Sequence, residues 1–192
     1  MRKGINLLLA LGLIAAGLGY PIGAHAIEED VVIFRSLDDP DVPAPTIQWC
    51  RDNAPPGVPP LPAEAIVPLG ASLWSTQTRA SDGTVVNETV RQVGTGQACA
   101  YFLGGAAPGS SNPFYFEGNA KDLEFEAAGE CLIISNDVPQ AGIFLQGCSL
   151  GIDPDPAQGL LGGLVTTNTV FNPFGIPGLN TGSFWSLHVY WE

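Results

Sequence analysis

The residues best suited to chemistry lie in the second half of the chain, where a serine between glycines precedes acidic residues and a histidine. Residues 147–151 read Gly-Cys-Ser-Leu-Gly, which places Ser149 at the centre of a G-x-S-x-G pattern. Asp153 or Asp155 follows, and then His188, so a nucleophile, an acid and a base occur in that order. In such a set the histidine removes the serine proton and the acid orients the histidine.

This pattern resembles the small secreted hydrolases of the cutinase type, which share the length, export and disulfides expected here. The resemblance implies a nucleophile at Ser149 on a sharp turn between a strand and a helix, whose backbone amides stabilise an oxyanion. Residues 143–146 fit the strand, but residues 153–156 read Asp-Pro-Asp-Pro and cannot begin that helix. A serine hydrolase is therefore our alternative hypothesis, and we predict no catalytic residue.

Metal and cofactor chemistry is not indicated by the residue types. Of the two histidines only His188 follows the expected leader, and the four cysteines lack the close spacing of a zinc site. The carboxylates within residues 38–41 and 153–155 lack the spacing of a calcium loop and are expected as solvated turn residues. We predict no metal and no cofactor. Nucleic acid is excluded as a partner because 19 acidic and 7 basic residues give a net charge of −12.

The first residues of the chain have the three-part pattern of a secretory signal peptide. Two basic residues precede an apolar run over residues 5–18, and Ala24 and Ala26 supply the small residues of a cleavage site. The apolar run is shorter than the ~20 residues that span a bilayer. We expect residues 1–26 to be removed and the bacterial protein to be secreted or periplasmic, with no membrane contact beyond the signal peptide.

The four cysteines form an even set in an exported chain and predict two disulfides. Cys131 and Cys148 enclose two apolar runs joined by a turn that contains Pro and Gly. If the hairpin is centred on residues 139–140, these two cysteines lie directly opposite each other, close enough to bridge. This predicts a Cys131–Cys148 bond and leaves Cys50 to pair with Cys99.

We expect three parts along the chain: the signal peptide over residues 1–26, a Pro-rich segment over residues 27–69, and a β domain over residues 70–192. Residues 38–68 hold nine prolines, which oppose both helix formation and central-strand pairing. The Pro-rich segment is therefore expected to lie extended on the surface of the β domain.

Short β-prone runs separated by Gly and Pro predict an all-β fold of about eight antiparallel strands, in a single β-barrel or β-sandwich. A hairpin is expected over residues 70–94 with its turn at residues 81–83. The run over residues 184–191 alternates in the manner of a buried terminal strand. The nearest approach to a helix is residues 119–129. Further strands are expected at residues 97–103, 114–117, 123–126, 132–134, 143–145 and 164–171.

The last strand carries two further resemblances. Gly182 followed by alternating Trp185, Leu187, Val189 and Trp191 resembles the closing strand of chaperone–usher pilus subunits, which implies assembly by strand donation to an open sheet edge. The chain length and this aromatic strand are similar to those of small eight-stranded outer-membrane barrels, which implies a membrane location. Residues 94–96 are similar to a strand of soluble barrels of the dirigent and allene oxide cyclase type.

A binding or assembly role, with an unknown small ligand or protein as partner, is the function that we expect. Rigid β scaffolds place recognition on their loops, so residues 104–112 and 172–182 are the expected contact segments. Four aromatic residues are expected to fill the core or, in a closed barrel, to line a pocket. They are Trp74, Tyr101, Phe114 and Tyr115.

Overall fold

The structure is a computed structural model that describes residues 27–78, 85–86 and 91–192. The expected signal peptide, with Ala24 and Ala26 at its cleavage site, and the expected turn at residues 81–83 lie outside these residues. No helix within the described ranges is long and apolar enough to cross a membrane.

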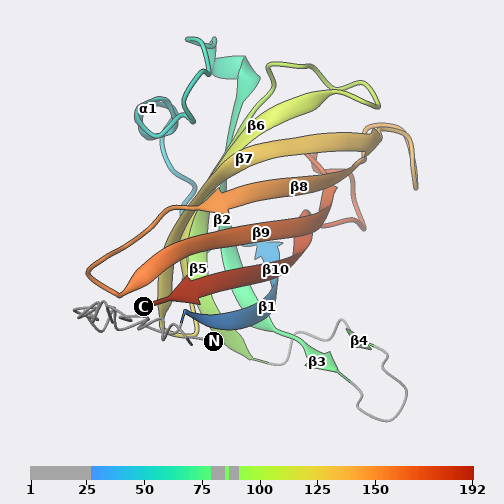
Figure 1. The fold of residues 1–192 in the computed structure, drawn as a ribbon. Coiled ribbons are helices and arrows are strands. Elements are labelled where there is room, and N and C mark those ends of the chain that lie inside the picture. The colour runs from blue at the N-terminus through green and yellow to red at the C-terminus, as the bar shows by residue number, and fades with distance from the viewer. Residues whose placement is uncertain (1–26, 79–84, 87–90) are drawn as a thin grey trace, which may run out of the picture.

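Eight strands form a closed antiparallel barrel, in the order β1-β10-β9-β8-β7-β6-β5-β2 (Figure 1). Each barrel strand pairs with the barrel strand that follows it in the chain, and the last strand, β10, pairs with the first, β1, which closes the ring. The expectation of about eight antiparallel strands is confirmed, and of the two expected architectures the chain forms the barrel. The barrel strands are β1 (Glu28–Asp38), β2 (Ile66–Ser75), β5 (Gln92–Tyr101), β6 (Ser111–Ala120), β7 (Leu123–Ser135), β8 (Phe144–Ile152), β9 (Leu160–Phe171) and β10 (Gly182–Trp191).

The two ends of the barrel differ in what they carry. At one end, here the loop end, lie the connections over residues 102–110, 136–143 and 172–181. At the other, here the terminal end, lie Ile27 and Glu192 together with the short pair β3 (Gln77–Thr78) and β4 (Val85–Val86), which projects from the barrel (Figure 1).

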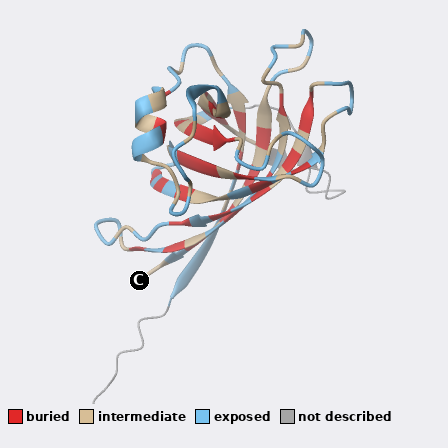
Figure 2. Ribbon diagram, turned by 90° about the horizontal axis from the view of Figure 1, so that it is seen from above, coloured by how far each residue is buried: buried red, intermediate tan, exposed pale blue. Residues whose placement is uncertain are grey.

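Aromatic rings fill the middle of the barrel. Buried residues alternate with less buried ones along the strands (Figure 2), as expected when one face of each strand points inward. Trp185 packs on Phe34 with ring centroids 5.5 Å apart and on Phe116 at 4.6 Å, and Phe125 lies 5.3 Å from Phe116. A Cβ atom at Gly96 would lie 2.3 Å from the Phe116 ring, so that glycine makes room for the aromatic cluster.

The segment expected to lie extended over the barrel contains a strand and a helix as well. Residues 28–38 form β1, a full member of the barrel, so the expected part over residues 27–69 is not one covering segment. The short helix α1 (Ile47–Asp52) contradicts the expectation that prolines exclude helix there. It forms because the residues between Pro45 and Pro55 lack proline and the Thr46 side chain accepts a hydrogen bond from the Trp49 N–H.

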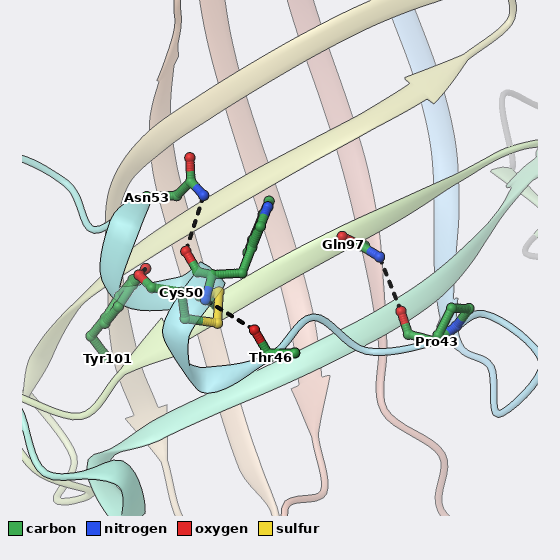
Figure 3. The surroundings of a disulfide bond; sticks show 8 residues. Pro43, Thr46, Cys50, Asn53, Gln97 and Tyr101 are labelled. Carbon is green, nitrogen blue, oxygen red and sulfur yellow. Dashed lines mark hydrogen bonds between the residues drawn. A yellow bond between two sulfur atoms is a disulfide. The ribbon is translucent and has the colours of Figure 1, made fainter.

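A second apolar core lies outside the barrel, between α1 and strands β2, β5 and β6 (Figure 3). The Cys50–Cys99 disulfide, with 5.7 Å between its Cα atoms, joins the helix to the outer face of β5. The buried Tyr101 hydroxyl donates to the Cys50 carbonyl oxygen at 2.6 Å. Trp49 contacts Tyr115 edge to face at 5.5 Å. The predicted Cys50–Cys99 pairing is therefore confirmed, and it attaches the covering segment to the barrel.

The Cys131–Cys148 disulfide is also confirmed, and it lies inside the barrel. The two residues are directly paired between β7 and β8, with 4.0 Å between their Cα atoms, which suits a bridge between opposite positions of an antiparallel pair. Both cysteines are buried in the main core. Two disulfides are compatible with an oxidising, exported location.

The segment nearest to a helix in its sequence pattern, residues 119–129, forms a tight hairpin instead. β6 and β7 are joined by Lys121 and Asp122, whose φ angles of 53° and 72° are those of a two-residue hairpin turn. After the turn Leu123 and Phe125 point inward and Glu124 points outward. The alternation of apolar and polar residues with a period of two, which favours a strand, therefore matches the structure of this segment.

Two buried tyrosines are expected to keep their protons at high pH. Burial raises the pKa of Tyr101 to about 12, and burial together with a hydrogen bond to Glu126 raises the pKa of Tyr115. The unfolded chain releases these protons near the ordinary value of 10.0, so the contribution of the two tyrosines to the free energy of unfolding is constant below that pH and falls as pH rises through it toward 12. Phenolate absorbance measured alongside urea unfolding checks this. Ionisation of both tyrosines near pH 10.0 in the folded protein would contradict it.

Candidate functional site

A row of buried or half-buried polar side chains crosses four strands inside the barrel near the loop end. Ser36 on β1 is paired with Ser183 on β10, Ser183 with Thr169 on β9, and Thr169 with Gln146 on β8. We call these four residues the polar row. Most other inward side chains on these four strands are apolar and belong to the hydrophobic core of the barrel.

The opposite wall at this level is built from small residues. Ala71 on β2, with Ala98 and Ala100 on β5, faces the interior and fills little space. A cavity of about 40 Å³ therefore stays open between this wall and the polar row, bounded by Trp185 toward the aromatic cluster. We call it the chamber. Its volume exceeds the space that one water molecule needs.

Most hydroxyls of the chamber bond to one another or to a neighbouring ring. The Thr169 hydroxyl lies 3.1 Å from that of Thr167 and 2.7 Å from that of Ser183, so these three side chains form a chain of hydrogen bonds. The indole N–H of Trp185 donates to the Ser36 hydroxyl at 2.9 Å. These bonds hold the hydroxyls in fixed positions around the chamber.

Gln146 differs from its neighbours because its side-chain amide has no hydrogen-bond partner among the described residues. It is only 8% exposed, and it lies against the chamber. Its amide atoms are accessible from the chamber, because the fully buried side-chain polar atom without a partner among the described residues is Trp191 Nε1 and not an atom of Gln146. The amide offers two donors and one acceptor oxygen, and the space in front of it is where a partner would lie.

The chamber opens toward a second hollow at the loop end, here the mouth pocket, with a volume of about 380 Å³. The two hollows share Asp38 and Thr181 in their walls. The rest of the mouth pocket is built from Pro40 and the β9–β10 loop over residues 172–180. A molecule in the mouth pocket would therefore lie directly beside the chamber.

The β9–β10 loop is held in shape by one side chain. The Asn172 amide donates to the carbonyl oxygens of Ile176 and Leu179, at 2.9 and 2.6 Å, and its own oxygen accepts from the Ile176 N–H at 2.9 Å. The Thr181 hydroxyl accepts from the Asn172 N–H at 3.0 Å. These bonds give the wall of the mouth pocket a defined conformation.

Asp38 is the charged group at the junction of the two hollows. Its pKa is raised, mainly because partial burial disfavours the carboxylate and also because Asp39 repels it, while a hydrogen bond to the backbone of Asp39 opposes the rise. Among the described residues, no Lys, Arg or His lines either hollow. The side chains that line the two hollows are therefore neutral or acidic.

The other side of the loop end is closed by apolar side chains. Phe102 stacks on Phe171 with ring centroids 6.0 Å apart, and Phe144 lies 6.2 Å from Phe171. Ile133 is fully buried with them. This cluster covers the barrel interior on the side of β5, β7 and β8, so the opening lies beside Asp38.

A larger groove of about 640 Å³ lies on the outer face of β5, β6 and β7. Burial, together with repulsion from Glu126, raises the pKa of Glu117, and Glu126 accepts a hydrogen bond from Tyr115 at 2.9 Å. In the part of the chain that the structure describes, no three His, Cys, Asp or Glu side chains are placed to hold a metal ion. The acidic residues along the groove are Glu117, Glu124, Glu126, Asp153 and Asp155.

The residues of the serine hydrolase hypothesis lie apart on the outer face. Ser149 is an exposed residue inside β8, which continues to Ile152, so the turn that such a nucleophile needs is not formed there. His188 lies two strands away on β10 and binds the Glu29 carboxylate at 2.9 Å. Asp153 follows β8 and its N–H donates to the Glu126 carbonyl oxygen.

Of the four aromatic residues expected in the core or a pocket, only Phe114 lines the chamber. Tyr101 and Tyr115 are buried in the outer core beneath α1, and Trp74 is half-buried on β2. The expected contact segment over residues 172–182 does reach the site, because it forms the wall of the mouth pocket.

The polar row was missed in the sequence, although a signal for part of it exists. Gln146 stands between Phe144 and Cys148 in an alternating strand, so its position predicts an inward side chain. That Ser36 lies beside Ser183 could not be read from the sequence, because it depends on the closure between β1 and β10.

The barrel strands leave no unpaired edge among the described residues, since each one has two hydrogen-bonded neighbours and β10 pairs with both β9 and β1. An open edge is what strand donation requires.

Comparisons of the chain with family models, with curated proteins and with solved structures found no match. The proposal for function therefore depends on the residues of the chamber and the mouth pocket.

Proposed function

We propose that this protein is an exported binding protein that takes a small molecule at the loop end of its barrel. The ligand places a hydrogen-bonding group in the chamber and its remaining atoms in the mouth pocket. The observation that carries this proposal is the amide of Gln146, an inward side chain that has no hydrogen-bond partner among the described residues and is accessible from an open cavity.

The interior of the barrel around the polar row is mostly apolar. Polar side chains are costly in such a place unless they are bonded, and the hydroxyls of Thr167, Thr169 and Ser183 meet that condition by bonding to one another. Gln146 has no such bond, and its amide instead faces the open space of the chamber. A ligand that forms hydrogen bonds with this amide explains why position 146 holds a glutamine.

The size of the site limits the ligand. The chamber holds only a few atoms in about 40 Å³, whereas the mouth pocket of about 380 Å³ falls within the range of sites for small molecules. The rigid walls also favour binding, because the Asn172 bonds hold the loop in one conformation before the ligand arrives.

The test is titration of the isotope-labelled, oxidised protein with two neutral probes, N-methylacetamide and butanediol, followed by NMR. Both probes are expected to shift the backbone amide signals of residues around the chamber, in a saturable way at millimolar concentration. Gln146→Met is expected to weaken their binding at least about tenfold, which corresponds to 1.4 kcal/mol.

Gln97→Met is the matched control, because the Gln97 amide donates to the Pro43 carbonyl oxygen at 3.2 Å on the outer face of the barrel. This variant is expected to bind both probes as the wild type does. Signals that do not move with either probe, or equal binding by Gln146→Met, would overturn the proposal and leave a buried water as the partner of the amide.

A further inference from the structure

We infer that the ligand is a small organic cation that carries a neutral hydrogen-bonding group, with its charge beside Asp38 and its neutral group in the chamber. This inference rests on the proposed function and adds the chemical class of the ligand. Amino alcohols are the simplest members of the class. Three features of the site point to this class: the position of Asp38, the neutral lining of the chamber and the absence of basic groups from the described walls.

Asp38 has the position that a residue binding the charged end must have. It follows Ser36 by two residues on β1, and it lines both the chamber and the mouth pocket. Its N–H donates to the Thr181 carbonyl oxygen at 3.0 Å, which fixes the end of β1 against the β9–β10 loop. A positive group in the mouth pocket would lie beside this carboxylate.

The electrostatics at the mouth favour a cation over an anion. Asp38 and Asp39 repel each other, and partial burial adds to the cost of the Asp38 charge, as its raised pKa shows. A bound cation offsets both effects, whereas an anion adds to the repulsion. The described walls hold no basic side chain to compensate for an anion.

The chamber requires a neutral group. It is enclosed by hydroxyls that are already bonded, by the Gln146 amide and by alanines and aromatic rings. A charge there would lose its water without gaining an opposite charge, which is strongly unfavourable. A hydroxyl or amide group can instead accept from the Gln146 Nε2–H and donate to its Oε1.

The experiment compares three four-carbon probes with a hydroxyl at one end and a different group at the other: aminobutanol, butanediol and hydroxybutanoate. Their dissociation constants are measured by the same NMR titration on the oxidised protein. Aminobutanol is expected to bind at least about tenfold more tightly than butanediol, and hydroxybutanoate more weakly than both.

Asp38→Asn is expected to remove the preference for aminobutanol over butanediol while butanediol binding stays as in the wild type. The matched control is Asp155→Asn, because Asp155 is a half-buried acidic residue in the β8–β9 loop at the terminal end, away from both hollows. This variant is expected to keep the full preference, which separates a local effect from the net charge of −12.

The outcomes separate this inference from the proposed function. If butanediol binds at the chamber as tightly as aminobutanol, or if Asp38→Asn keeps the preference, the inference is overturned and the proposed function stands. If neither neutral probe shifts the chamber signals, the proposed function fails, and any binding of aminobutanol elsewhere on the acidic surface overturns the inference with it.

Discussion

Replacing Trp185 with alanine is expected to lower the free energy of unfolding by about 3–5 kcal/mol. Trp185 is 2% exposed and lies between Phe34 and Phe116, with ring centroids 5.5 and 4.6 Å away. Alanine would remove these contacts and leave a void that eight paired strands cannot collapse to fill. It would also leave the Ser36 hydroxyl without its donor.

Urea unfolding followed by far-ultraviolet circular dichroism measures this loss. Phe174→Ala is the control, because Phe174 is 72% exposed and touches the barrel only at its rim. That variant is expected to stay within about 0.5 kcal/mol of the wild type. A loss below about 1 kcal/mol for Trp185→Ala would show that the ring is not part of a close-packed interior.

Removing the Cys50–Cys99 bond by a double alanine substitution is the second change that is expected to lower the free energy of unfolding strongly. The bond closes a loop with a sequence separation of 49, and the chain-entropy model gives about 4 kcal/mol for such a loop. The six-residue α1 is too short to be stable alone, so the covering segment should also become sensitive to protease.

The comparison is the double substitution of Cys131 and Cys148, whose sequence separation of 17 gives about 3 kcal/mol in the same model. Urea unfolding and limited proteolysis of both variants check the prediction. An unchanged unfolding free energy for the Cys50→Ala, Cys99→Ala protein, with the segment still protected, would show that packing alone holds α1 on the barrel.

The sequence predicted the fold class well because alternation and cysteine spacing are local signals. The register of Cys131 opposite Cys148 followed from the symmetry of one hairpin, and the structure confirms it. The inward face of the last strand followed from period two, as Leu187 and Val189 are fully buried. Neither prediction required knowledge of how distant strands pair.

What the sequence did not predict depends on distant pairing or on small local exceptions. β1 reads as a polar strand with three acidic residues at its start, and it became a barrel strand only through pairing with β10 and β2. Thr46 and the proline-free residues after it allow α1 within a Pro-rich segment.

The candidate site was predicted only in part, for the same reason. The loop over residues 172–182 was expected as a contact segment, and it does form the mouth pocket. Serine, threonine and glutamine in strands read as ordinary polar residues, however. Their alignment across four strands appears only when the barrel closes. Ser149 and His188 matched a motif in sequence order, but they lie on separate outward positions.

The most direct test of the binding site is the free energy of unfolding of Gln146→Met, measured without ligand beside wild type and Gln97→Met. If the amide is kept for a ligand, methionine removes a polar group that has no protein partner at nearly constant shape, so stability is expected to rise by about 1 kcal/mol. Gln97→Met, which loses a hydrogen bond to Pro43, is expected to show no gain. A Gln146→Met stability equal to or below that of the wild type would contradict the account, because the amide would then already be satisfied in the unliganded protein.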